Sequence, residues 1–145
     1  MNEHDMVLEW LQKSADDLYS AEVLQRVGML ANSCYHAQQA GEKALKAYLV
    51  QCEQEVPYTH NLGLLCKLCM QLDETFAEIF QASSALTDYA TITRYPGGDA
   101  VDEEETELAI QHAGRVFVFT QQRIPGIEQE TVQQQELTNG FNMQM

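Results

Sequence analysis

The stretch CYHAQQAGEKALKAYL, residues 34–49, decides the fold of this chain. At about 100° per residue, its small and apolar side chains fall within one arc of a helical wheel, as expected for an amphipathic helix. The arc contains Cys34, Ala37, Gly41, Ala44, Leu45, Tyr48 and, just beyond the stretch, Cys52. We therefore predict a helix over about residues 31–53 that packs this side against a core.

The other side of this helix carries a polar ridge of His36, Gln39, Lys43 and Lys46. His36 and Lys43 are seven residues apart, so they lie almost above one another on the helix. Two interpretations are open at this point. The ridge is either the solvated back of a core helix or a binding site. Periodicity alone favours the solvated back.

Apolar residues recur at helical spacing in the rest of the chain, and no stretch shows the alternation of a half-buried strand. We expect further helices over about residues 5–27, 60–71, 75–89 and 103–123. Pro57, Pro96 and Pro125 fall between these segments. The pattern predicts an all-α up-and-down bundle of four to five helices over residues 1–125. The Gln-rich tail, residues 126–145, is expected either to be disordered or to pack on a partner.

Several residues are predicted to begin or break these helices. Thr59 is the expected N-cap of the third helix, and Ser83-Ser84 is a candidate break in the fourth. Asp102 and Glu105 have the spacing of a capping box before the fifth helix. The acidic run that follows Asp102 then lies in a first helical turn, where the helix dipole favours negative charge.

The charge balance limits the classes of partner. The chain has 145 residues, 22 of them acidic and 8 basic, for a formal net charge of −14. This excludes an extended nucleic-acid surface, which needs clustered lysine and arginine, and it disfavours an anionic membrane surface. No apolar run approaches the roughly 20 residues that cross a bilayer. The acidic start MNEHDMVLEW is unlike a signal peptide, so we expect a cytoplasmic protein.

The four cysteines are Cys34, Cys52, Cys66 and Cys69, and disulfides are not expected in a reducing cytosol. Cys66 and Cys69 have metal-ligand spacing, with His60 shortly before them. Leucines surround the pair at helical spacing, however. Buried thiols on an apolar helix are therefore the favoured interpretation, and neither a metal nor a cofactor is expected.

Four segments, in order, resemble the HEPN domain family (higher eukaryotes and prokaryotes nucleotide-binding). The segments are Trp10 with Ala15–Leu18 and Ala21, Tyr35–Ala47, Pro57 with Thr59–Leu62, and Leu86–Tyr89 with Thr93–Pro96. The resemblance covers about residues 5–123 and leaves out the tail. Gly41 stands where the family usually has alanine, and Asn61 where aspartate is common. Gly41→Ala would stabilise an uncrowded helix and harm a crowded one.

The resemblance implies a helical bundle that forms a homodimer, with one of two kinds of function. Some family members are RNA-cleaving toxins with an arginine, four to six residues, and then a histidine. Others bind nucleotides or are partners of small nucleotidyltransferases. Here residues 95–101, which follow Arg94, contain no histidine, and Arg26 lies ten residues before His36. We therefore expect a non-catalytic domain that binds a nucleotide, or pairs with a nucleotidyltransferase, or both.

The candidate ligand-binding residues are His36, Gln39, Lys43, His60, Arg94 and Tyr95. In this hypothesis Lys43 and Arg94 contact phosphates, Tyr95 stacks on a base, and the histidines donate hydrogen bonds. Each has a structural alternative. Arg94 pairs with Asp88 or Glu42, Tyr95 closes the core, and His60 caps the third helix.

Two other functions stay open. One is a ribonuclease toxin-like HEPN protein with an atypical site, in which His36 and Lys43 replace the usual motif. The other is a purely structural interaction subunit, whose acidic surface covers a basic partner as an antitoxin does.

Overall fold

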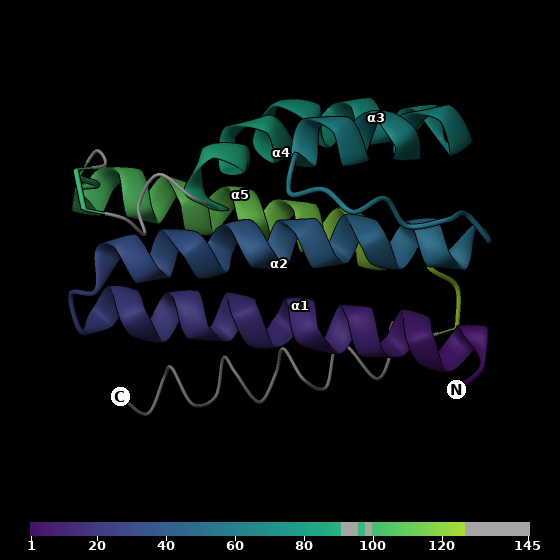
Figure 1. The fold of residues 1–145 in the computed structure, drawn as a ribbon, viewed down its shortest axis with the longest axis horizontal. Helices are drawn as coiled ribbons and strands as arrows, with labels where there is room; N and C mark the ends of the chain where they lie inside the picture. The colour runs from purple at the N-terminus through teal and green to yellow at the C-terminus, as the bar shows by residue number, and fades with distance from the viewer. Residues whose placement is uncertain (91–95, 98–99, 127–145) are drawn as a thin grey trace.

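The computed structural model describes residues 1–90, 96–97 and 100–126, and this part of the chain is built from helices and turns (Figure 1). The predicted all-α bundle is confirmed. The elements, in order, are α1 (Glu3–Arg26), α2 (Leu30–Gln51), α3 (Leu62–Leu72), the 3₁₀ helix η1 (Glu74–Ile79), α4 (Phe80–Leu86), the 3₁₀ helix η2 (Thr87–Ala90) and α5 (Glu103–Gln121).

A tight turn joins α1 and α2, which run antiparallel along most of their length (Figure 1). Gly28 has a φ of 83°, a conformation in which glycine has no Cβ penalty. The Met29 N–H donates to the Leu24 carbonyl at 2.9 Å, and the Gly28 N–H donates to the Gln25 carbonyl at 3.1 Å. This is a Schellman motif, which ends α1 and reverses the chain.

The helix predicted from residues 34–49 is the centre of the bundle. α2 packs against α1, α5 and α3, so it is buried on most of its circumference. The predicted core arc is buried, apart from half-buried Cys52. Ala40 and Ala47 are fully buried, and the Ser14 hydroxyl donates to the Ala40 carbonyl at 2.6 Å. The small side chains of α2 therefore let α1 approach its backbone.

Two local predictions around α3 are wrong. Thr59 does not cap this helix; the Asn61 side chain accepts a hydrogen bond from the Leu64 N–H at 3.0 Å, so α3 begins later. Asparagine and aspartate are equivalent N-caps, which makes the departure at Asn61 conservative. The fourth helical segment breaks between η1 and α4, and Ser83-Ser84 lies inside α4. These serines are small, and a Cβ on Gly63 of α3 would lie only 2.9 Å from the Ser84 Oγ, so the serines allow close packing of α3 and α4.

The start of α5 and its Asp102 cap agree with the prediction, whereas the Glu105 side chain accepts a hydrogen bond from the Tyr89 hydroxyl. The Asp102 side chain accepts a hydrogen bond from the Glu105 N–H at 2.7 Å, and Glu103, Glu104 and Glu105 occupy the first turn. The acidic run is thus explained by helix initiation and dipole compensation. No helix in the described ranges is long and apolar enough to cross a membrane. Arg94, Tyr95 and residues 127–145 of the tail lie outside the described residues.

Gly41 faces the most crowded part of the bundle. A Cβ added there would lie 2.8 Å from the Leu62 Cδ2 and 3.0 Å from the Leu86 Cδ1, and both leucines are fully buried. Glycine inside a helix weakens it by about 0.5–1 kcal/mol relative to alanine. The close approach of Leu62 and Leu86 explains why α2 tolerates glycine at this position.

Gly41→Ala is expected to lower the free energy of unfolding by about 1 kcal/mol, because overpacking outweighs the gain in helix propensity. Urea denaturation measures the change. Gly114→Ala in α5 is the matched control, because an added Cβ there would meet nothing within 4 Å beyond the adjoining residues and backbone of its own helix. This control should raise the stability by up to about 1 kcal/mol. Equal stabilisation by both substitutions would contradict the assigned packing.

Candidate functional site

Two carboxylates organise the polar side of α2. The first is Asp17 of α1, which is buried at the α1–α2 contact. Its Oδ1 lies 2.8 Å from the His36 Nδ1, and its Oδ2 accepts a hydrogen bond from the Lys43 ammonium at 2.6 Å. One carboxylate of α1 thus fixes two side chains that stand two turns apart on α2.

The second carboxylate is Glu42 of α2 itself, whose side chain is only 5% exposed. It accepts hydrogen bonds from Lys46 at 2.8 Å and from Gln38 at 3.1 Å, and it lies 2.8 Å from the His60 Nδ1. Burial alone would raise the pKa of Glu42. The hydrogen bonds from Lys46, His60 and Gln38 outweigh burial, so the pKa of Glu42 is lowered.

Three further contacts complete the arrangement. Gln39 donates to the Gln38 side-chain oxygen at 2.7 Å, and Gln38 also donates to the His60 carbonyl at 3.2 Å. The Lys46 ammonium lies 5.8 Å from the centre of the Trp10 ring, within range of a cation–π interaction. We call this set the α2 polar face, and it comprises Asp17, His36, Gln38, Gln39, Glu42, Lys43, Lys46 and His60.

The α2 polar face leaves hydrogen-bonding groups accessible to solvent. The side chains of His36, Lys43 and His60 are 32%, 23% and 63% exposed. An ionised carboxylate only accepts hydrogen bonds, so the Nδ1 of each histidine carries a hydrogen and each Nε2 is left for another partner. Lys43 likewise uses one N–H for Asp17 and keeps two. The α2 polar face therefore holds polar groups in fixed positions, and some of their hydrogen-bonding atoms are left for a further partner.

The structure places four of the six predicted site residues here: His36, Gln39, Lys43 and His60. Arg94 and Tyr95 lie outside the described residues. The alternative that His60 caps α3 is wrong, because its ring bonds to Glu42 and Asn61 is the cap. The ridge is only partly a solvated helix back, because Lys46 is buried and His36, Gln39 and Lys43 are half-buried.

The sequence-based prediction missed the two residues that organise the face, Asp17 and Glu42, and also Gln38. A signal for Asp17 was available, since Ala15–Leu18 is one of the segments that resemble HEPN domains. Its pairing with Lys43 depends on the register of α1 against α2, which helical periodicity does not give. Glu42 lies beside the ridge on a helical wheel, but its burial depends on the path of residues 53–61.

Cys66 and Cys69 are buried, as the apolar pattern of α3 predicts. The Cys66 thiol donates to the Phe76 carbonyl at 3.4 Å, and the Cys69 thiol donates to the Leu45 carbonyl at 3.8 Å. Burial raises the pKa of both thiols, so they are held as neutral, unreactive groups. Among the described residues, no three His, Cys, Asp or Glu side chains gather as metal ligands.

Comparisons with known proteins agree with this architecture. The HEPN domain family model matches residues 7–124. TT1696 from Thermus thermophilus has a similar crystal structure, with 26% identity, a TM-score of 0.69, and coverage of 84% of this chain and 98% of that one. ST0689, an archaeal HEPN homologue, has 25% identity, a TM-score of 0.66, and coverage of 81% and 97%. No curated protein matches the sequence.

Glu42→Ala is expected to lower the free energy of unfolding by about 3 kcal/mol or more, because it leaves the Lys46 ammonium buried without its carboxylate. Urea denaturation measures the loss. Glu107→Ala, which removes an exposed carboxylate of α5, is the control and should change stability by less than about 1 kcal/mol. The double replacement of Glu42 by Leu and Lys46 by Met should recover part of the loss. A small effect in Glu42→Ala would contradict the assigned burial.

The contribution of Glu42 should also depend on pH. Its pKa in the folded chain is lowered from the ordinary value of 4.5, so its stabilising effect is fully present above about pH 4.5. The effect is lost as the pH falls through the lower folded value. Glu42→Gln imitates the protonated side chain. The stability difference between wild type and this variant should therefore shrink as urea denaturation is repeated at decreasing pH below 4.5.

Proposed function

The chain belongs to the HEPN family, and from this premise we propose that it is a non-catalytic domain that binds the phosphate of a nucleotide on the α2 polar face. One observation carries the proposal. Asp17 and Glu42 hold four nitrogen-bearing side chains in fixed positions along this face, namely His36 and Lys43, and His60 and Lys46. Fixed donors lose little conformational entropy when they bind an anion.

The local charge supports an anionic ligand. The two carboxylates of the face are balanced by the ammonium groups of Lys43 and Lys46, whereas the whole chain has a net charge of −14. An anion therefore meets less repulsion here than the acidic average of the protein would impose. Lys43 offers two further N–H groups to a phosphate, and each histidine keeps its Nε2 for a further hydrogen bond.

The runner-up is an atypical ribonuclease, and one contact favours it. Asp17 orients His36, which leaves the His36 Nε2 able to accept a proton, as a general base must. Cleavage also needs a cation that stabilises the phosphorane. Lys43 is the candidate for this cation, because it shares Asp17 with His36, but Asp17 already neutralises its charge. The Arg-to-His motif of the family's ribonucleases is also missing. Binding is therefore the better-supported function.

The proposal includes two kinds of protein partner. The first is a second copy of the chain, as the family resemblance implies, and sedimentation equilibrium should then give twice the chain mass of 16.4 kDa. The second is a small nucleotidyltransferase, towards which the chain acts as a subunit or antitoxin. The strongly acidic composition favours a partner with a basic surface. Both assemblies belong in the cytoplasm, where nucleotides are present.

Saturating AMP, ATP or GTP is expected to raise the melting temperature of the wild-type chain, because a ligand that binds only the folded state stabilises it. Lys43→Gln should weaken the affinity at least about tenfold, as loss of one charged hydrogen bond predicts. Isothermal titration calorimetry measures the Kd of the nucleotide for the wild-type chain and for the Lys43→Gln variant. Lys67→Gln removes the same charge from α3 and should leave the affinity unchanged. Absence of binding, or equal binding by Lys43→Gln, would refute the assigned site.

The same preparations distinguish binding from cleavage. Incubation of single-stranded RNA with excess protein should leave the RNA intact. RNA loss that disappears in His36→Asn would instead support the atypical ribonuclease.

A further inference from the structure

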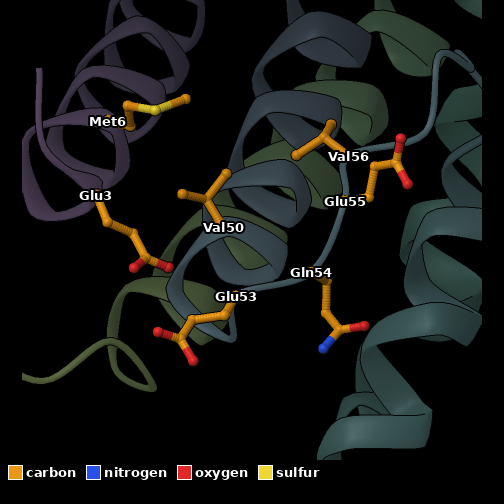
Figure 2. A pocket seen from close by; sticks show the side chains of 7 residues that line it. All are labelled: Glu3, Met6, Val50, Glu53, Gln54, Glu55 and Val56. Atoms are coloured by element: carbon orange, nitrogen blue, oxygen red, sulfur yellow. The ribbon is translucent and has the colours of Figure 1, made fainter.

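An open hollow lies at one end of the bundle, where α1 begins and α2 ends (Figure 2). Its volume is about 500 Å³. Glu3 and Met6 reach it from α1, Val50 from the last turn of α2, and Glu53, Glu55 and Val56 from the loop that follows. None of these residues belongs to the α2 polar face, so the hollow is a separate feature of the surface.

The hollow combines an apolar floor with an acidic rim. Met6, Val50 and Val56 supply the apolar surface, and the rim carries three carboxylates, those of Glu3, Glu53 and Glu55. Figure 2 shows the Glu3 side chain extending from α1 towards the end of α2, on the side where Glu53 lies. No basic residue lines the hollow. Within the described part of the chain, none of the three carboxylates takes part in an ion pair.

The two helix ends at the hollow carry opposite dipoles: the first turn of α1, which contains Glu3, is a positive end, and the α2 terminus is a negative end. The last carbonyl groups of α2 carry the negative end of the helix dipole, and its last turn has no basic residue to offset them. Glu53 stands immediately after the helix cap with a φ of 59°, a position that favours glycine. Neither helix termination nor dipole compensation accounts for a glutamate there, since both would prefer another residue.

We propose that this hollow is the docking site for a basic side chain, lysine or arginine, that a partner protein presents between apolar neighbours. Such a side chain matches both parts of the hollow. Its aliphatic stem covers Met6 and Val56, while its charged head reaches the carboxylates. The inference rests on the proposed role of the chain as a partner subunit, and it identifies the surface at which a basic partner binds. Charge complementarity at such a rim also speeds association and makes it sensitive to salt.

A fluorescein-labelled peptide that alternates valine or leucine with lysine and arginine tests the proposal. Fluorescence anisotropy at low ionic strength measures its Kd for the intact chain. The Glu53→Gln/Glu55→Gln variant should weaken binding about tenfold, as expected from the loss of two rim charges. Met6→Gln should weaken it severalfold, because the floor becomes polar. A peptide with norleucine in place of lysine and arginine should not bind.

The Glu78→Gln/Glu104→Gln variant is the matched control. It removes two exposed carboxylates that lie away from the hollow, so the net charge changes equally. Its peptide affinity should stay within about twofold of wild type. Equal weakening by both double variants would mean that the peptide senses only the overall charge, and would overturn the proposal. So would failure of the peptide to bind.

Two further measurements separate this inference from the proposed function. The affinity for nucleotide should not change in Glu53→Gln/Glu55→Gln, because these residues lie outside the α2 polar face. If the wild-type chain binds no nucleotide, peptide binding still tests the docking site separately. Sedimentation equilibrium of the same variant should match wild type. A change in self-association without a change in peptide affinity would assign the hollow to contact with a second copy and overturn the docking of a basic partner segment.

Discussion

The burial of two carboxylates, Asp17 and Glu42, is the constraint on which the polar side of this bundle depends. A buried carboxylate is tolerated only when its oxygens are hydrogen-bonded and its charge is matched. Asp17 meets this requirement with His36 and Lys43, and Glu42 with Lys46, Gln38 and His60. The side chains proposed to bind a ligand are therefore held by pairing that the fold itself requires. The hydrogen bonds of Asp17 and Glu42 thus both stabilise the fold and position the side chains of the proposed binding site.

The small residues of α2 explain how these carboxylates come to be buried. Gly41 admits Leu62 and Leu86, and fully buried Ala40 lies where Ser14 of α1 bonds to the α2 backbone. A central helix with large side chains on every side would hold its neighbours further away. Its polar residues would then face water, where ion pairs contribute little. The small residues of α2 thus explain both the close packing on its apolar side and the fixed side-chain positions on its polar side.

Much of this fold is predictable from the sequence, and what is not predictable follows from what helical periodicity measures. The spacing within residues 34–49 predicts which side of α2 enters the core, and the Asp102–Glu105 spacing predicts the start of α5. Both depend on contacts within one helix. The pairing of Lys43 with Asp17 depends on how two helices are aligned, and the burial of Glu42 depends on a loop that returns over α2. The apolar pattern of a single segment gives neither the alignment of two helices nor the path of a loop. The same limit explains why Thr59 was chosen as a cap over Asn61, two residues away.

The α2 polar face and the hollow beside the α2 terminus differ in charge, although both lie on one acidic protein. On the α2 polar face, each carboxylate is neutralised by a lysine, and the remaining N–H groups suit an anion. At the hollow beside the α2 terminus, three carboxylates line the rim without a basic residue among the described lining residues, and the apolar floor suits the stem of a basic side chain. A partner that carries a basic segment and handles nucleotides would use both surfaces without competition between them. The net charge of −14 therefore does not conflict with the proposed nucleotide ligand: the acidic surface would favour association with a basic partner, and the paired lysines would leave one face to the phosphate.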